Sequence, residues 1–313
     1  MATGSLVLAT AGGILLALSF AAHVVHAVLL AAGRRSAALP LAPATPAWAG
    51  VATGGFVDAH RLAAGRPAEI AAGRTGAGPF AIGLAAAAAL ALGASLLLRA
   101  LVVARGPWGN LYEFTVAFAF TTTVGYLLLE RRNAIRAVGF VPVGVALGLF
   151  LYAASLPSGI EPLVPALQNA PLLTIHVGTA TIAYGILATS FAAGVGYLVQ
   201  GREDRFAWLP SHRVLDEVAW RSVIVGFPVF ATMIVLGSWW ASIAWSRYWG
   251  WDPKETASLV TWLVYAVYLH ARNRRSWAGR PAALLLVVGF AMVLVTYSGS
   301  LWFSGLHAYS GLD

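Results

Sequence analysis

Long apolar runs alternate with short polar connections along this chain. Eight runs are long enough to consider as membrane spans, because a helix needs about 20 residues to cross the hydrocarbon core of a bilayer. Backbone groups inside a membrane must be bonded within the protein, and long uniform runs achieve this as helices. The pattern therefore predicts an all-α, polytopic integral membrane bundle of about eight transmembrane helices, at 5–32, 80–103, 112–130, 136–154, 172–199, 221–243, 256–271 and 282–303. The run 256–271 is the shortest, and we expect it to take its first turn from the residues before it.

Positive charge lies on alternate connections between these runs. Sixteen of the 20 lysine and arginine residues fall in the connections 33–79, 131–136, 201–221 and 272–280. Because cationic loops stay cytoplasmic, we expect both termini and the remaining connections on the extracytoplasmic side of a plasma (inner) membrane. The net charge of +8 is then a topology signal. It indicates contact with membrane lipid and no nucleic-acid partner.

Composition agrees with this class of protein. Hydrophobic residues make up 59% of the chain and charged residues 10%, which is typical of an integral membrane protein. The chain contains no cysteine, so it forms no disulfide and offers no thiolate ligand. We expect two parts: residues 1–79, a first transmembrane helix with a flexible cytoplasmic insert, and residues 80–313, a transmembrane domain.

Tryptophan is concentrated just before the run 256–271, in the sequence WWASIAWSRYWGWDPKETASLVTW at 239–262. Five tryptophans fall within thirteen residues, whereas an aromatic belt at a membrane surface accounts for one or two per helix end. We interpret the segment as a platform for a large planar ligand. Its members are Trp239, Trp240, Trp245, Trp249 and Trp251, followed directly by Asp252.

Charged residues follow the tryptophans, and their role has two interpretations. The simpler one is a structural ion pair of Asp252 or Glu255 with Lys254 or Arg247. The other is that Lys254 or Arg247 meets a carboxylate of the ligand.

Two histidines lie at the ends of predicted helices on the extracytoplasmic side. His176 lies about one turn inside the run 172–199, and His307 follows the run 282–303. A neutral imidazole is a good iron ligand, and two opposed imidazoles ligate haem. The alternative is a pair of unrelated histidines that cap helix ends.

The other histidines fall toward the cytoplasmic side. His270 shares a helix face with Trp262 and Ala266, which are spaced four residues apart, so a planar ligand could lie against that face. Alternatively, His270 extends to the membrane surface beside Arg272. His23 and His26 either oppose His270 or hydrogen-bond to neighbouring helices. His60 and His212 fall in basic loops, where we expect them to be solvated.

Three motifs together resemble a known family. They are WGWDPKE at 249–255, SGLHAYSG at 304–311 and GNLYEF at 109–114. With the order of the histidines, they resemble the CcsA/ResC family of System II cytochrome c biogenesis (called CcsB in actinobacteria). Its members, like CcmC and CcmF, are WWD-domain haem-handling membrane proteins. The resemblance covers about 80–313 and implies a haem-handling transmembrane domain with an external WWD segment at about 237–257.

The resemblance also implies a function. A member moves haem b (iron protoporphyrin IX) to the outer face and holds it in the WWD site. There the haem is attached through thioethers to the CxxCH segment of apocytochrome c, which makes the protein a subunit of a holocytochrome c synthase, or haem lyase. The implied partners are a CcsB/ResB-type membrane protein, apocytochrome c and a thiol-reducing thioredoxin-like protein.

The site residues implied by the resemblance form two groups. The external haem iron takes His176 and His307 as axial ligands, and an intramembrane haem iron takes His270 together with a ligand from the partner. Haem is held at these sites by Trp239, Trp240, Trp245, Trp249, Trp251, Asp252 and Trp262.

Two other functions remain as alternatives. One is a CcmC-like module that delivers or exports haem without lyase activity. The other is a b-type electron-transfer cytochrome, which predicts widely spaced histidine pairs within helices, whereas only His23 and His26 share a helix. The role of Glu113 is open between an acid at a helix N-terminus and a part of the haem route.

Overall fold

The computed structural model describes residues 1–33, 76–160, 163, 167–168, 170–272, 274 and 277–307, and its regular structure within these ranges is entirely helical. The insert predicted within 1–79 falls at 34–75, outside the described residues. The helices are α1 (Ala2–Ala32), α4 (Ala77–Val103), α5 (Leu111–Glu130), the 3₁₀ turn η1 (Arg136–Val138), α6 (Phe140–Ala154), α7 (Ala170–Gln200), α8 (His212–Trp245), α9 (Pro253–Arg272) and α10 (Arg280–Trp302).

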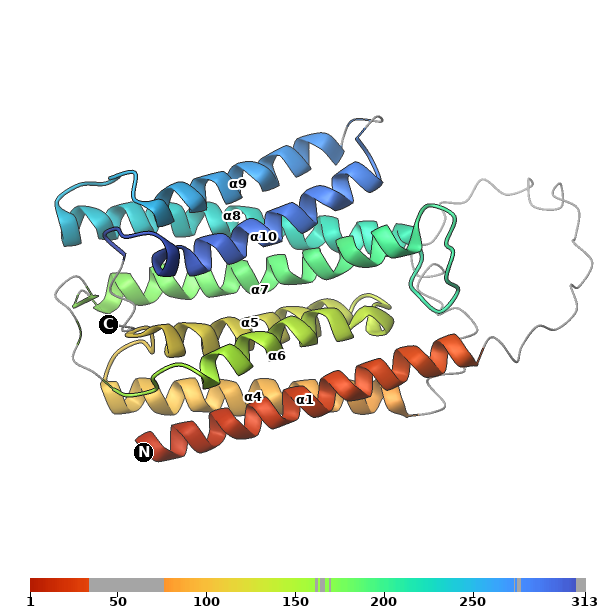
Figure 1. The fold of residues 1–313 in the computed structure, drawn as a ribbon, viewed down its shortest axis with the longest axis horizontal. Helices are drawn as coiled ribbons and strands as arrows, with labels where there is room; N and C mark the ends of the chain where they lie inside the picture. Colours follow the sequence, from red (N-terminus) through yellow and green to blue (C-terminus); the bar gives the residue numbers. More distant parts are fainter. Residues whose placement is uncertain are drawn as a thin grey trace, which may run out of the picture.

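The helices run side by side with alternating direction (Figure 1). Helix α7 is central, since it packs against α5 on one side and against α8 and α10 on the other, while α1 pairs with α4 and α9 with α10. The connections 104–110 and 246–252, the segment 303–307 and the N-terminus lie at one end, which we call the tryptophan end. The connections 131–139, 201–211 and 277–279 lie at the opposite, basic end.

The predicted fold class is confirmed. Seven of the helical segments are long and apolar enough to cross a membrane, so the chain is a multi-pass helical membrane protein. The two sets of connections separated by charge lie at opposite ends of the bundle, as alternating spans require. Helix α9 begins at Pro253, which confirms that the shortest run takes its first turn from the tryptophan segment.

Helix α9 is not among these seven apolar segments, and its polarity has a structural cause. Thr261 donates to the Met292 carbonyl of α10 at 3.0 Å and lies 2.9 Å from the Thr296 hydroxyl. Tyr265 packs so closely on α10 that a Cβ added to Gly289 would lie 2.8 Å from its ring. The Thr261 hydroxyl therefore faces α10, where it finds partners, instead of lipid. It belongs to a buried stripe that repeats every three or four residues along α9: Ser258, Thr261, Tyr265 and Tyr268.

The predicted start of α8 at residue 221 was wrong. The helix begins at His212, and the Ser211 hydroxyl accepts a hydrogen bond from the Val214 amide in the first turn. The first turns are charged, which lowers their hydropathy but does not stop the helix, because Asp216 pairs with Arg272 of α9 at 2.6 Å. His212 is therefore a helix residue and not the loop residue that we expected.

The tryptophan segment is divided between a helix and a connection. Trp239, Trp240 and Trp245 lie on the last turns of α8, whereas Trp249 and Trp251 lie in the connection 246–252. Because a helix separates neighbouring side chains by 100°, adjacent tryptophans on α8 face different surroundings. Trp239 is 55% exposed and Trp240 is 1% exposed.

Helices α5 and α7 approach closely through glycine. A Cβ on Gly185 would lie 2.5 Å from the backbone carbonyl of Thr121, and the Thr121 hydroxyl donates to the Thr181 carbonyl at 2.7 Å. Close backbone approach at small residues is a common way to pack membrane helices, which lack a hydrophobic driving force between them. This contact sets the distance between α5 and α7.

We predict that Gly185→Ala destabilises the protein by about 1–3 kcal/mol, the usual cost of overpacking. The measurement is thermal unfolding in detergent. The matched control is Gly148→Ala on α6, where a Cβ meets nothing within 4 Å and alanine improves helix propensity. Equal melting temperatures for the two variants would contradict the close α5–α7 contact.

Candidate functional site

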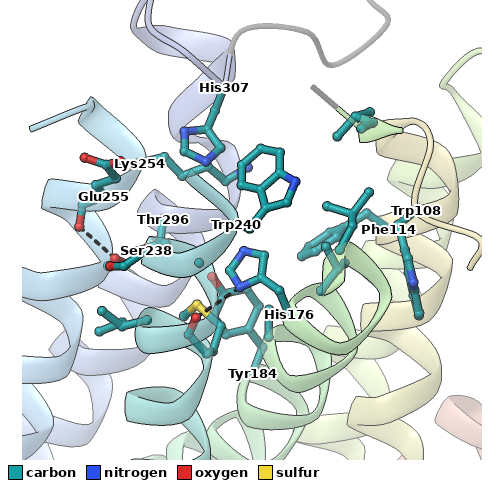
Figure 2. A pocket seen from close by; sticks show the side chains of 18 of the residues that line it. Trp108, Phe114, His176, Tyr184, Ser238, Trp240, Lys254, Glu255, Thr296 and His307 are labelled. Atoms are coloured by element: carbon teal, nitrogen blue, oxygen red, sulfur yellow. Dashed lines mark hydrogen bonds between the residues drawn. The ribbon is translucent and has the colours of Figure 1, made fainter. Parts of the chain in front are cut away.

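A cavity opens among the helix ends at the tryptophan end of the bundle (Figure 2). It contains about 1080 Å³ of space, counting the part open to solvent, which suits a large ligand. Five helices and the segment after α10 contribute to its wall. The aromatic and histidine residues that line it are Trp108, Phe114, His176, Tyr184, Trp240, Trp249 and His307.

The neighbouring helix α8 fixes the ring of His176. Its Nδ1 donates to the Met233 carbonyl at 3.0 Å. A Cβ on Gly237 would lie only 2.7 Å from the Cε1 atom of His176, so glycine at this position allows the imidazole to lie against α8. A hydrogen bond from Nδ1 to a carbonyl assigns ligation to Nε2.

A carboxylate fixes the ring of His307. The Nδ1 atom of His307 lies 2.8 Å from Oδ1 of Asp252, and Oδ2 of Asp252 accepts from the Leu306 amide at 2.6 Å. Asp252 also caps α9, because its Oδ1 accepts from the Lys254 amide at 2.9 Å. One side chain thus joins the start of α9 to the segment after α10.

The same contacts set the charge states. Burial raises the pKa of Asp252, but hydrogen bonds from His307, Lys254 and Leu306 outweigh this effect and lower the pKa to about 2. Burial lowers the pKa of His307, against the opposing effect of Asp252. At neutral pH the pair is therefore a carboxylate and a neutral imidazole, which is the form of histidine that binds iron.

Trp240 contacts both histidines (Figure 2). Its indole is nearly parallel to the ring of His176, at 6.2 Å between centroids and 8° between planes, and lies 5.9 Å from the ring of His307. Trp245 packs on Trp240 at 4.7 Å and on His307 at 4.9 Å. Residues 131 positions apart in the sequence are thus joined through one buried aromatic cluster.

The remaining tryptophans are arranged differently. Trp249 lines the cavity, and Trp251 meets it edge to face at 5.8 Å while being 69% exposed. Trp251 also has a φ of 55°, which costs free energy for a non-glycine residue. Trp239 is exposed, and Trp262 stacks on Phe227 of α8 at 4.8 Å, away from the cavity wall.

His270 lies at the other end of α9, near the basic end, and is exposed. It accepts a hydrogen bond from Arg274 Nε at 3.1 Å, whereas Arg272 pairs with Asp216. The structure therefore separates His270 from the cavity that holds His176 and His307.

His23 and His26 are buried on α1. His23 contacts the Tyr126 hydroxyl at 2.9 Å and the Ser19 carbonyl at 2.8 Å, as expected for hydrogen bonding between neighbouring helices. Nδ1 of His26 has no hydrogen-bond partner among the described residues.

The expected ion pair in the WWD segment was wrong. Among the described residues, neither Lys254 nor Arg247 has a carboxylate oxygen within 4 Å. Glu255 instead accepts from the backbone amides of Gly250 at 2.8 Å and Asp252 at 3.1 Å. Hydrogen bonds from backbone amides to an ionised carboxylate are strong, so these two bonds stabilise Glu255 in the turn without a side-chain cation.

The structure also decides the local role of Glu113. Its buried carboxylate accepts from Arg99 at 2.6 Å, from the Gly109 amide at 2.6 Å and from Arg105 at 3.3 Å. Asn110 caps α5 by accepting from the Glu113 amide at 2.9 Å. Glu113 thus anchors the connection 104–110, which carries Trp108 into the cavity wall.

Sequence reasoning missed Trp108, Phe114 and Tyr184 as cavity residues. Phe114 belongs to the quoted motif GNLYEF and Trp108 directly precedes it, so the motif marked the region but not the side chains. Nothing in a single sequence distinguishes Tyr184 from other aromatic residues inside a membrane helix.

The two histidines in the cavity suit iron that is already held in a macrocycle. No group of three or more His, Cys, Asp or Glu side chains capable of holding a bare metal ion occurs in the described part of the chain. Two oriented imidazoles can supply axial positions only, and the aromatic walls suit a flat ring. These residues therefore fit haem.

Comparisons with known proteins agree with this chemistry. Residues 108–307 match the family model described as cytochrome C assembly protein. A "Cytochrome c biogenesis protein CcsA" from a Synechococcus species is 35% identical over 261 residues, covering 72% of this chain and 85% of the relative. The protein of the same name from Synechococcus elongatus is 35% identical over 284 residues, covering 73% and 87%. That from Mesostigma viride is 31% identical, covering 65% and 77%.

We predict that Asp252→Asn loosens the segment 303–307. Losing charge-assisted hydrogen bonds costs about 1.5–3 kcal/mol, so amide hydrogen exchange of Leu306 should accelerate by about tenfold to a hundredfold. Hydrogen-exchange mass spectrometry of peptides that cover this segment measures the change. Glu217→Gln, in an exposed pair with Arg221 on α8, is the control and should leave this exchange unchanged.

The same carboxylate predicts a pH dependence. Because the folded-state pKa of Asp252 is about 2 and its ordinary value is 3.8, its stabilisation is fully present above about pH 4 and is lost as the pH falls toward 2. An exchange rate at Leu306 that did not differ between Asp252→Asn and the parent chain would contradict the stabilising role of the Asp252 hydrogen bonds.

Proposed function

The chain belongs to the family of cytochrome c assembly proteins, and on that premise we propose that it is the haem-handling membrane subunit of a System II cytochrome c synthase. The family membership gives it a role in cytochrome c maturation as a multi-pass membrane protein. The proposal adds three points. The chain moves haem b to the extracytoplasmic face, holds it at the tryptophan end and presents it for attachment to the CxxCH segment of apocytochrome c.

One observation carries the proposal. His176 and His307 come from the beginning of α7 and the end of the described chain, yet both line one cavity and both contact Trp240. Each imidazole is oriented by a hydrogen bond through Nδ1. The acceptor is the Met233 carbonyl for His176 and the Asp252 carboxylate for His307. Such outer hydrogen bonds orient metal-binding histidines in general.

Haem is the substrate in this proposal, and the chain contributes position instead of a nucleophile. In the attachment, each cysteine S–H of apocytochrome c adds across a vinyl C=C bond of haem, so that one C–S bond and one C–H bond form and no electrons are gained or lost. The chain has no cysteine, so both thiols come from the apocytochrome. Holding one reactant rigidly in the reactive orientation contributes much of the rate enhancement in such reactions.

The orientation in the membrane follows from charge. Sixteen of the 20 lysine and arginine residues fall in the segments 33–79, 131–136, 201–221 and 272–280. The described parts of these segments lie at or near the basic end, and the positive-inside rule assigns that end to the cytoplasm. The cavity then opens to the extracytoplasmic side of the plasma membrane, where CxxCH segments would meet the haem. A thioredoxin-like protein would keep their thiols reduced.

A second haem position, near the basic end, is part of the proposal. His270 is exposed on α9 and lies far along the helix from the cavity. One imidazole ligates only one side of an iron, so this position needs a second ligand, which we assign to a CcsB/ResB-type membrane partner. Trp262 lies two turns away along the same face of α9.

We predict that His176→Gly and His307→Gly have similar defects and that the double variant is scarcely worse, because residues that act as a unit are not additive. Each variant should change a six-coordinate haem spectrum into one open to added imidazole, and should reduce cytochrome c maturation in cells. Absorption spectra of the purified protein and haem-stained cytochrome c are the measurements.

His212→Ala, at the basic end, is the control and should keep the parent spectrum. A normal six-coordinate spectrum in either glycine variant would show that the two histidines do not share an iron. Multiplicative defects in the double variant would argue against a common site.

We predict that His270→Ala, coexpressed with the partner, loses the inner haem and keeps the spectrum of the outer site when haem is supplied from outside. Arg274→Gln removes the hydrogen-bond donor to His270 but keeps the imidazole, so it should retain both haems. Normal cytochrome c maturation by His270→Ala would show that transport does not need the inner position.

A further inference from the structure

The cavity wall contains a lysine that has no ion-pair partner among the described residues. Among the described residues that line the cavity, Lys254 is the one lysine or arginine and Glu255 the one acid. Lys254 lies in the first turn of α9, and its Nζ is 6.0 Å from the centre of the Phe114 ring on α5. The ammonium group therefore faces the cavity wall formed by another helix.

Both acids beside Lys254 in the sequence are engaged elsewhere. Asp252 binds His307, the Leu306 amide and the Lys254 backbone amide. Glu255 binds the amides of Gly250 and Asp252. The side chain of Lys254 is only partly exposed, and a cation with reduced access to water is stabilised by a close anion. Among the described residues, no carboxylate oxygen lies within 4 Å of its ammonium group.

We propose that Lys254 binds a propionate carboxylate of the haem. This inference rests on the proposed function and assigns one further contact at the same site. The first turn of a helix that carries a lysine is a favourable place for an anion, since the helix dipole and the ammonium charge both attract it. The described lining of the cavity contains no second lysine or arginine. The contact with Lys254 therefore determines where the propionate edge of the haem lies.

This contact would orient the haem within its plane. The two propionates share one edge of the porphyrin, and the vinyl groups lie on the other half of the ring. Two axial histidines leave the macrocycle free to rotate about the line through the iron, whereas a third contact at the propionate edge removes that freedom. Lys254 is thus a positioning residue that determines where the vinyl groups lie for thioether formation.

The test compares haem with its dimethyl ester, in which both propionates are uncharged. Purified full-length chain in detergent is titrated with each porphyrin, and dissociation constants come from the absorbance change. The parent chain should bind haem about 10–100-fold more tightly than the ester, the value expected for a charge-assisted hydrogen bond of about 1.5–3 kcal/mol. Lys254→Met should bind both with the affinity of the ester.

The comparison of parent and variant removes any difference in detergent partitioning between the two porphyrins. Lys254→Arg keeps the charge and should keep the preference for haem. Arg247→Met is the matched control, because it removes an exposed cation from the connection directly before α9 and should also keep the preference. Thermal unfolding of each variant checks that the fold is retained.

The outcomes distinguish this inference from the proposed function. If the parent chain binds haem through His176 and His307 but Lys254→Met keeps the full preference over the ester, the lysine contact is wrong and the proposed function stands. The same conclusion follows if the parent chain shows no preference. If the parent chain binds neither porphyrin in a histidine-dependent manner, the proposed function fails and the lysine contact fails with it.

Discussion

The hydrogen bonds of Asp252 connect the start of α9 to the segment after α10, and the cavity depends on this connection. Its carboxylate caps α9, accepts from the Leu306 amide and orients His307 through Nδ1. The described part of the segment after α10 has no regular helix of its own to hold it, so these bonds set its position relative to α9. The low pKa of this carboxyl, about 2, means that the contacts persist over the whole physiological pH range.

The opposite wall is held by packing instead of charge. His176 projects from α7, the central helix, and its ring is limited by the Met233 carbonyl and by the space beside Gly237. One imidazole therefore lies on a rigid helix and the other on a tethered segment, with Trp240 in contact with both. This division suits the proposed function, in which a large ligand enters and leaves the cavity, because a segment without regular structure opens more readily than a packed helix.

Hydropathy predicted the helix boundaries except where polar side chains in a helix bind a neighbouring helix. The start of α8 was missed because Asp216 and its neighbours lower the hydropathy of a turn that pairs with α9. Helix α9 is less apolar than the other spans, and its Thr261 hydroxyl donates to the Met292 carbonyl of α10. Hydropathy reports composition, whereas a buried hydroxyl is acceptable in a membrane wherever a neighbouring helix provides its partner.

The sequence by itself determined the class of the molecule, the separation of its connections into two sets and the family resemblance, because these depend on run length, charge and local motifs. It also marked His176 and His307 as residues at the same end of the bundle. Only the tertiary structure decided that both line one cavity, that the Asp252 carboxylate binds the His307 ring and not the Lys254 ammonium group, and that Trp240 is buried while Trp239 is exposed. The physical reason is that these facts depend on the rotation of each helix about its axis and on contacts between residues far apart in the chain.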